Sequence, residues 1–414
     1  MSADKKVPDI RFKGFSGEWE KNYLGNLIEI RSAARVHKEQ WTEVGVPFFR
    51  TSDVISIYKG QENNKAYISH TVYQGLSEKI GKVTKNDLLI TGGGSIGIPY
   101  LVPNNEPLYF KDADLLWLKN NKKFDGYFLY SFFFSEPFKK YIKSISHTGT
   151  IAHYTIEQAK TTPINTCSNK EQTQIGNYFQ KLDNLINQHQ QKHDKLSNIK
   201  KSMLEKMFPK QGETVPEIRF KGFSEVWEQS NLARCTDLLT GNPFNSKEFT
   251  AEGIFLVRGM NVKRGYLDTS KEISAYWPSF KGLESYLLKP EDIVIQMDGA
   301  LIGKSYAKIK SSNLPAILVQ RVTRVRCSEV NSEFIYQYIQ KNFLNYIWGI
   351  KTETAVPHLS LHDIKNFSIF LPTKKEQTAI GNYFQKLDTL IEQHQQQITK
   401  LNNIKQACLS KMFI

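Results

Sequence analysis

The chain carries one long segment twice: KEQTQIGNYFQKLDNLINQHQQ at Lys170–Gln191 and KEQTAIGNYFQKLDTLIEQHQQ at Lys375–Gln396, identical at 19 of 22 positions. In and beyond both copies, apolar residues recur every seven residues at two positions, which is typical of coiled-coil helices. Because the chain holds one copy of each helix, we expect the two helices to pair with each other. The residues predicted to form the seam and assemble the helices are Ile175, Tyr178, Leu182, Leu185, His189, Leu196, Ile199, Met203, Ile380, Tyr383, Leu387, Leu390, His394, Leu401, Ile404 and Cys408.

A shorter motif is also repeated ahead of each helix. PDIRFKGFSGEWE at Pro8–Glu20 returns as PEIRFKGFSEVWE at Pro216–Glu228, with 10 of 13 positions identical. The residues between motif and helix have diverged, but a histidine stands 18 residues before the Glu-Gln-Thr glutamate in both halves, at His153 and His358. Each half of the chain therefore consists of an entry motif, a diverged interior and a segment predicted to form a long helix.

The diverged interiors have the pattern of compact α+β domains. Short apolar runs at Val46–Phe49, Asp87–Ile90 and Leu115–Leu118 are bounded by Gly, Asn and Pro, which predicts strands. Asp125–Lys143 and Ser332–Ile347 carry aromatic residues at helical spacing and are predicted to pack inside each domain. The predicted fold class is two related α+β domains and two long helices.

Charge and composition narrow the possible functions. The chain has 55 Lys and Arg against 41 Asp and Glu, a net charge of +14, which favours a polyanionic partner such as nucleic acid. No apolar run is long enough to span a membrane, and the N-terminus has no apolar signal region. Four scattered cysteines without a Cys-x-x-Cys spacing favour a reducing compartment. We therefore expect a cytoplasmic protein with no membrane association.

Catalytic motifs occur only as incomplete matches. The glycine-rich run Gly92–Gly97 has Pro99 where a dinucleotide-binding helix would follow, and Gly299–Ser305 is one residue short of a phosphate-binding loop. The histidine pairs His189/His193 and His358/His362 lack the glutamate of a zinc-protease motif. We expect no catalytic residues, no metal site and no enzymatic activity in this chain.

The repeated segments resemble the conserved regions of type I restriction–modification specificity (S) subunits. The residues that carry the resemblance are the helix motifs Glu171–Ile186 and Glu376–Ile391, the lead-in segments Ile151–Pro163 and Val356–Pro372, and the entry motifs Trp19–Leu24 and Trp227–Leu232. The resemblance covers essentially the whole chain, and its paired form is more specific than a single copy would be.

The resemblance implies a division of the chain and a set of partners. It places a first target-recognition domain at 1–168, a central spacer helix at 169–208, a linker and second target-recognition domain at 209–374, and a distal spacer helix at 375–414. The implied function is reading the two halves of an asymmetric bipartite DNA site. Implied partners are double-stranded DNA, two adenine-methylating modification subunits and two ATP-driven restriction subunits. S-adenosylmethionine, ATP and Mg²⁺ would belong to those subunits, and none to this chain. A DNA-binding scaffold without restriction partners is the alternative.

A bipartite site also implies antiparallel helices, with the reading domains at opposite ends of the pair. Antiparallel pairing matches Leu182 with Ile404 and Leu196 with Leu390, and it sets Tyr178 against Cys408. A parallel pair would instead set Tyr178 beside Tyr383.

Arg, Lys, Asn and Gln side chains on exposed turns are the favoured readers of base edges, because their donors and acceptors match those of the bases. Arg50 and Arg258 lead the candidates, since they occupy matching positions after apolar runs. The first-domain candidates are Arg31, Arg35, His37, Lys38, Arg50, Ser52 and the loop from Thr91 to Ser95. The second-domain candidates are Asn242, Asn245, Lys247, Arg258, Asn261, Lys263, Arg264, Gln296, Asp298, Lys304, Gln320 and Arg321.

Overall fold

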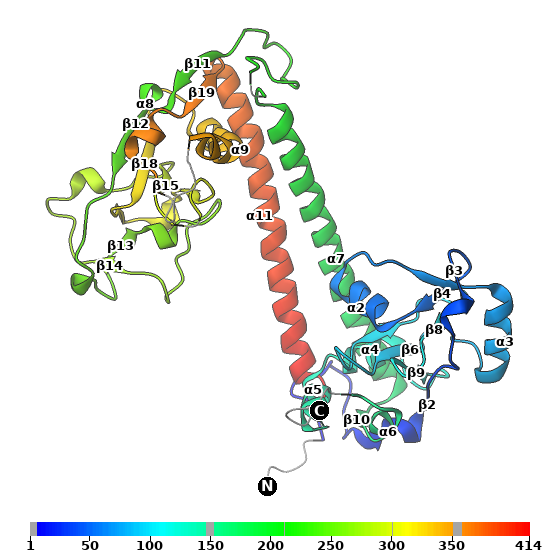
Figure 1. Cartoon of the computed structure of the whole chain (residues 1–414). Coiled ribbons are helices and arrows are strands. Elements are labelled where there is room, and N and C mark those ends of the chain that lie inside the picture. Colours follow the sequence, from blue (N-terminus) through cyan, green and yellow to red (C-terminus); the bar gives the residue numbers. More distant parts are fainter. Residues whose placement is uncertain (1–5, 146–152, 211, 300, 351–357) are drawn as a thin grey trace. The chain divides into compact units, whose positions relative to one another are not determined.

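A computed structural model describes most of the chain (Figure 1). The described residues are 6–145, 153–210, 212–299, 301–350 and 358–414. The chain divides into two compact units: residues 1–190 with 396–414, and residues 191–395. Each unit therefore contains part of both long helices. Within the described residues, no helix is long and apolar enough to cross a membrane.

The first unit combines one four-stranded sheet with a second four-stranded sheet and a two-stranded ribbon. The strand orders are β2-β9-β6-β7, β3-β5-β4-β8 and β1-β10. Its elements ahead of the long helix are β1 (Glu20–Tyr23), α1 (Leu24–Leu27), β2 (Glu29–Arg31), η1 (Lys38–Gln40), β3 (Trp41–Thr42), β4 (Val46–Phe49), α2 (Thr51–Lys59), β5 (Ala66–Ile68), α3 (His70–Ile80), β6 (Leu88–Thr91), β7 (Pro99–Leu101), β8 (Tyr109–Phe110), β9 (Leu115–Lys119), α4 (Gly126–Phe132), α5 (Glu136–Ile145), α6 (Ile156–Lys160) and β10 (Pro163–Thr166).

The second unit repeats this plan with one strand fewer in its second sheet. Its strand orders are β12-β18-β15-β16, β14-β13-β17 and β11-β19. Its elements are β11 (Glu228–Asn231), α8 (Leu232–Cys235), β12 (Thr236–Thr240), η2 (Ser246–Glu248), β13 (Ile254–Val257), η3 (Gly259–Asn261), β14 (Tyr276–Trp277), η4 (Glu284–Tyr286), β15 (Ile293–Gln296), β16 (Tyr306–Lys308), η5 (Ser311–Asn313), β17 (Ala316–Leu318), β18 (Val322–Cys327), α9 (Ser332–Ile350), α10 (Leu361–Lys365) and β19 (Ser368–Leu371).

The shared plan extends to strand direction. In both units one parallel pair, β4 with β8 and β13 with β17, stands among antiparallel neighbours. The clearest difference lies after the first strand of that pair. The first unit forms the helices α2 and α3 there, on either side of β5, whereas the second unit has the short 3₁₀ turns η3 and η4, on either side of β14. The two units are thus the same fold with different connections.

The predicted interior elements largely match the structure. β4 has the predicted bounds, β6 begins one residue later than Asp87, and β9 extends the predicted run by Lys119. The segment Asp125–Lys143 forms two helices rather than one, because the chain turns between α4 and α5 and Pro137 can occupy only the first turn of the second. The starts of the two lead-in segments, residues 151–152 and 356–357, lie outside the described residues.

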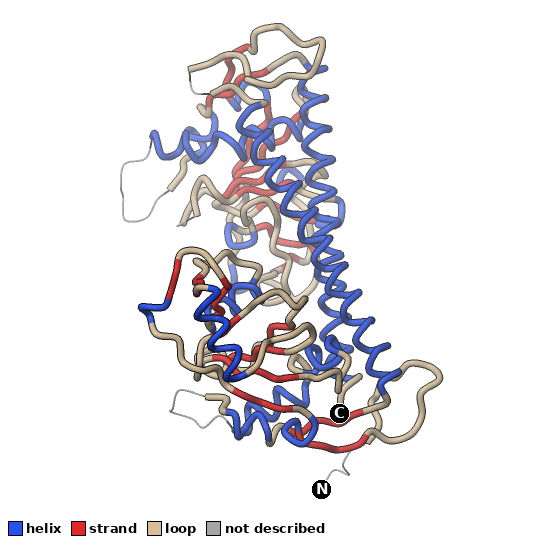
Figure 2. The backbone as a smooth tube through the Cα atoms, turned by 90° about the vertical axis from the view of Figure 1, so that its right-hand side faces the viewer, coloured by secondary structure: helices blue, strands red, loops and turns tan. Residues whose placement is uncertain are grey.

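The two long helices are α7 (Asn169–Lys206) and α11 (Lys374–Lys411). Within each unit they lie side by side (Figure 1 and Figure 2). In the first unit the start of α7 meets the end of α11: the Tyr178 hydroxyl lies 3.6 Å from the Cys408 Sγ. In the second unit the end of α7 meets the start of α11, where Lys200 Nζ lies 2.6 Å from Asp388 Oδ1. The helices are therefore antiparallel within each unit, as predicted.

The seam itself differs from the predicted one in detail. Ile175, Leu182, Ile380 and Leu387 are buried. The predicted seam residues Tyr178, Leu185, His189, Leu196, Ile199, Met203, Tyr383, Leu390, His394, Leu401 and Cys408 are half-buried. Ile404 was predicted in the seam but is 36% exposed, whereas the unpredicted Ile398 is 7% exposed. The strict heptad does not hold because the helices also pack against each domain, which buries additional faces.

Those additional faces include the last turns of the helices. Phe208, just after α7, packs on Trp227 and Phe384 in the second unit. Phe413, just after α11, packs in the same way on Trp19 and Phe179 in the first unit. Each unit thus closes its aromatic core with the end of one helix and the beginning of the other.

An ion pair joins the entry motif to the long helix in each unit. Arg11 contacts Glu171 through two hydrogen bonds, Nε at 2.7 Å and Nη2 at 2.8 Å. Arg219 contacts Glu376 in the same way, with Nε at 2.8 Å and Nη2 at 2.6 Å. The hydrogen bond to the glutamate raises the pKa of each arginine, Arg11 and Arg219 alike. Both glutamates are 1% exposed, so these are buried fork-to-fork pairs.

The glutamine that follows each of these glutamates fixes the start of a helix in the domain. Gln172 accepts a hydrogen bond from the Asp125 backbone N–H, and Asp125 in turn caps the start of α4. Gln377 and Asn331 repeat this arrangement at the start of α9. A Cβ on Gly176 would lie 2.0 Å from the Asp125 Oδ1. The glycine at this point of the helix is therefore required by the close approach of the cap.

Replacing this glycine should destabilise either unit. We expect Gly176→Ala, and equally Gly381→Ala, to lower the free energy of unfolding by about 1–3 kcal/mol through overpacking. Gly75→Ala in α3 is the matched control, because a Cβ there meets nothing within 4 Å. That control should be neutral or slightly stabilising. Denaturant unfolding monitored by circular dichroism measures all three, and equal stability of the three variants would contradict the packing argument.

Helix direction predicts a specific disulfide. In a variant with Cys167, Cys235 and Cys327 replaced by Ser, Tyr178→Cys should oxidise to an intramolecular bridge with Cys408, because a disulfide needs Cα atoms within about 7 Å. Ile175→Cys tests a slip in register. The control is the double variant Tyr178→Cys with Tyr383→Cys, with Cys408 also replaced by Ser, because a parallel pair would set these two residues side by side. Non-reducing electrophoresis after oxidation reads the result, and a bridge in the control but in neither test variant would refute the antiparallel pairing.

Candidate nucleic-acid interface

The predicted base readers fall into three groups by exposure. The exposed ones are Arg31, Arg35, His37, Lys38, Ser52, Ser95, Asn245, Lys247, Arg264, Gln320 and Arg321. The half-buried ones are Arg50, Asn242, Arg258, Lys263, Gln296, Asp298 and Lys304. Thr91 and Asn261 are fully buried.

The two buried candidates act inside their domains. The Thr91 hydroxyl donates to the Ser95 carbonyl and accepts from the Ile98 backbone N–H at 2.9 Å. The Asn261 amide donates to the Asp268 carbonyl at 3.0 Å, and its oxygen accepts from the Arg258 backbone N–H. Both side chains hold turns in place, which corrects the prediction that they face a base.

Several exposed candidates border η1 and the short helices. Arg35, His37 and Lys38 come from the segment that leads into η1, and Ser52 lies in the first turn of α2. Arg31 at the end of β2 forms an ion pair with Glu29 and donates to the Ile80 carbonyl at 3.1 Å. In the second unit, Asn245 caps η2 and accepts a hydrogen bond from the Lys247 backbone N–H.

The leading candidates, Arg50 and Arg258, occupy equivalent positions and have equivalent internal partners. Each precedes a helical turn whose third residue accepts its backbone N–H: Asp53 for Arg50 at 2.8 Å and Asn261 for Arg258 at 3.3 Å. The Arg50 Nε also donates to Asp53 at 2.9 Å, and the Arg258 guanidinium donates to the Ile273 carbonyl. Burial lowers the pKa of Arg258. Both side chains thus support the turn, and base contact by either stays a prediction.

One group of candidates does come together, at the ends of β15 and β17 in the second unit. Arg321, in the turn between β17 and β18, places Nη1 3.5 Å from Asp298 Oδ2 and 3.5 Å from His358 Nδ1. Asp298 follows β15 and pairs as an isolated bridge with His358. Gln296 ends β15 close by: a Cβ on Gly299 would lie 3.5 Å from its Nε2. We call Asp298, Arg321 and His358 the reader cluster.

His358 was not among the predicted readers. Its equivalent, His153, forms the same isolated bridge with Gly93 in the first unit. Both histidines are exposed. The signal was present in the sequence, since a histidine recurs at the same distance before the long helix in two otherwise diverged interiors.

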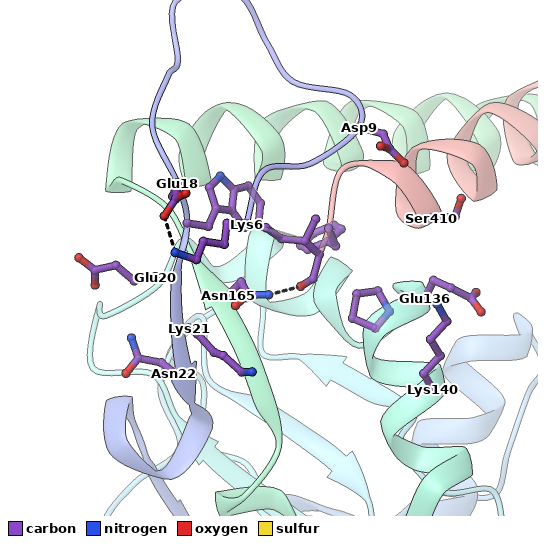
Figure 3. A pocket seen from close by; sticks show the side chains of 14 residues that line it. Lys6, Asp9, Glu18, Glu20, Lys21, Asn22, Glu136, Lys140, Asn165 and Ser410 are labelled. Carbon is purple, nitrogen blue, oxygen red and sulfur yellow. Dashed lines mark hydrogen bonds and ion pairs between the residues drawn. The ribbon is translucent and has the colours of Figure 1, made fainter. Parts of the chain in front are cut away.

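The first unit also has a hollow beside the last residues of the chain (Figure 3). Its volume is about 920 Å³, and side chains of both signs line it, among them Lys140 and Glu136. Lys6 pairs with Glu18 there at 2.8 Å, and Asn165 donates to the Ile414 carbonyl at 2.6 Å. None of the lining residues is a predicted base reader. The mixed charge makes this hollow a structural junction rather than a surface for a polyanion.

Spacing and burial limit metal binding and thiol chemistry among the described residues. No set of three or more His, Cys, Asp or Glu within them could hold a metal ion. Burial raises the pKa of Cys235 to about 11, and that of Cys167 and of Cys327 to about 12. These three thiols are therefore protonated at neutral pH and are poor nucleophiles.

The chain is similar in sequence or structure to several specificity subunits of type I restriction enzymes. The specificity subunit of the type I restriction enzyme MjaVIII from Methanocaldococcus jannaschii is 26% identical over 394 residues, covering 86% of this chain and 87% of the relative. The EcoAI specificity subunit from Escherichia coli is 30% identical over 172 residues, 41% of this chain and 29% of the relative. The crystal structure of a type I restriction–modification S subunit from M. genitalium has the same fold, with a TM-score of 0.66 at 16% identity over 99% of both chains.

The family model described as type I restriction modification DNA specificity domain matches twice, at residues 16–198 and 204–403. The two matches span nearly all of the chain. The chain therefore belongs to the family of type I restriction–modification DNA specificity domains.

Proposed function

We propose that this chain is the specificity subunit of a type I restriction–modification complex, and that each unit reads one half of an asymmetric, bipartite DNA site. The observation that carries the proposal is one fold present twice with different exposed connections. The strand directions correspond, although the sheet β3-β5-β4-β8 has one strand more than β14-β13-β17. The helices α2 and α3 of the first unit stand where the second has the 3₁₀ turns η3 and η4. Two units that share a fold but differ in their side chains suit two different half-sites.

The charge of the chain supports a nucleic-acid partner. Its net charge of +14 provides an attraction to phosphate that does not depend on sequence. The specificity must then come from side chains that reach base edges, because phosphate contacts carry no sequence information.

In this proposal the partner subunits carry out the catalytic steps. The chain would assemble with two methyltransferase subunits that bind S-adenosylmethionine and methylate adenine. Two restriction subunits that use ATP and Mg²⁺ would join in the full endonuclease. The specificity subunit itself would be non-catalytic and would work in the cytoplasm. Co-purification with a partner that binds S-adenosylmethionine distinguishes this assembly from a DNA-binding scaffold that acts alone.

Exchange of one interior tests the modular reading of DNA. Replacing residues 233–355 by the equivalent segment of another family member should change one half of the modified site and leave the other half intact. Mapping N6-methyladenine in DNA from cells that co-express the modification partner measures both halves together. A change in both halves, or in neither, would contradict the modular assignment.

Arginine variants test the leading base-reading candidates. If Arg50 and Arg258 contact bases with two hydrogen bonds, Arg50→Ala and Arg258→Ala should each weaken specific binding by roughly 1–3 kcal/mol. A phosphate contact would instead weaken binding to all DNA alike and lower the salt dependence. Titrations of specific and random DNA at two salt concentrations separate the two cases. Thermal unfolding of the same variants is the control, because both side chains support internal turns.

A further inference from the structure

The loops that carry the reader cluster share several backbone hydrogen bonds between the two units. The turn after the parallel strand places a non-glycine residue in the left-handed region in each: Ala113 with φ 60° and Arg321 with φ 73°. The backbone N–H that follows each histidine donates to the loop after β6 or β15, from Tyr154 to Gly92 and from Leu359 to Met297. The Gly92 backbone N–H donates to the Asp114 carbonyl, and the Met297 backbone N–H donates to the Arg321 carbonyl. Asp114 and Arg321 are therefore equivalent positions, each directly before the next strand, and Ala113 lies one residue earlier.

The side chains on this scaffold differ while the histidine is kept. Opposite the histidine the first unit has Gly93 where the second has Asp298. At the neighbouring position the first unit has Asp114, which pairs with Lys111 at 2.7 Å, where the second has Arg321. The two units thus carry opposite charges at one backbone position, which suits two different half-sites.

The conformation of Arg321 is costly for its residue type. A left-handed φ disfavours side chains other than Gly, Asn and Asp, and strained positions persist where the side chain has a task. The side chain is 54% exposed, so burial does not account for its presence. Asp298 and His358 contact the same guanidinium nitrogen, Nη1. The opposite edge of the guanidinium, formed by Nε and Nη2, carries donors with fork spacing.

We propose that Arg321 reads a guanine in the half-site of the second unit, with Asp298 and His358 holding its guanidinium in position. A guanidinium fork matches the O6 and N7 acceptors of guanine in the major groove, which is the commonest specific contact between protein and DNA. Asp298 at 3.5 Å orients the side chain without neutralising both of its edges. This inference rests on the proposed function and names the base class that one of its units recognises.

Residues of the first unit guide the choice of variants. Arg321→Ala removes the guanidinium, and Ala113 shows that an alanine can adopt nearly the same left-handed φ in this chain, so the turn should fold. Arg321→Lys keeps the charge but removes the fork. Asp298→Gly copies Gly93 and removes the positioning carboxylate. Arg234→Ala, an exposed arginine in α8 of the same unit, is the control for loss of one positive charge.

The experiment maps modified sites with the complex of full chain and methylating partner. The wild-type site should contain a guanine in the half assigned to the second unit by the interior exchange. Arg321→Ala and Arg321→Lys should both lower modification of that site about ten- to a hundred-fold and relax the guanine position alone, as expected for loss of a bidentate contact. Asp298→Gly should relax the same position less, and Arg234→Ala should leave it unchanged.

Three results would overturn the inference while the proposed function stands. The first is a second half-site without guanine, and the second is an unchanged base preference in Arg321→Ala. The third is a loss of modification in Arg321→Ala that is equal on all sequences and is restored in Arg321→Lys, which would mark a phosphate contact. Circular dichroism of each variant checks folding, and Arg321→Gly, which tolerates the left-handed φ, repeats the test if the alanine variant is unstable. A wild-type complex that modifies no site would overturn the proposed function itself.

Discussion

The buried ion pair between the entry motif and the long helix is the constraint on which both units depend. Arg11–Glu171 and Arg219–Glu376 each join residues that are far apart in the chain, and each glutamate is removed from water. A buried charge without its partner costs about 3–5 kcal/mol, so neither half of the pair can change alone. Next to it, Gln172 and Gln377 hold the caps of α4 and α9. One short stretch of helix thereby fixes the entry strand, the domain helix and the helix pair.

This arrangement explains why the two copies agree where they do. Asp183 with Lys405 in the first unit and Asp388 with Lys200 in the second are the same pair at equivalent positions, both at 2.6 Å. Each of these contacts joins one long helix to the other. A change in either helix therefore disturbs a unit that contains parts of both. The exposed turns carry no such mutual constraint. Their side chains are free to differ, and the reader cluster is one place where they do.

Much of this architecture could be predicted from the sequence, and the reasons for the remainder are physical. The repeat, the heptad pattern and the apolar runs identified the helices, several strands and the contact of Tyr178 with Cys408. The seam near Ile398 and Ile404 was placed wrongly, because the seven-residue repeat favoured Ile404 whereas Ile398 is the buried residue. Glu171 and Arg11 are charged residues that a single sequence assigns to the surface.

The candidate site was harder to predict than the fold. Thr91 and Asn261 are polar residues in turns, a pattern equally typical of base readers and of side chains that hold the turn itself. The pairing of Asp298 with Arg321 requires knowing which strand ends lie together, and strand order does not follow from one sequence. Only the repeated histidine carried a signal, because a residue kept in two diverged interiors indicates a shared role.

The division of the chain has a consequence for how the protein is made. The first unit is completed by residues 396–414, which the ribosome adds only after all of the second unit, residues 191–395. Until then Trp19 and Phe179 lack Phe413, and the first aromatic core stays open. The second unit, whose residues are contiguous, can close first. The later half of the polypeptide is therefore expected to finish folding before the earlier half, the reverse of the usual order during synthesis.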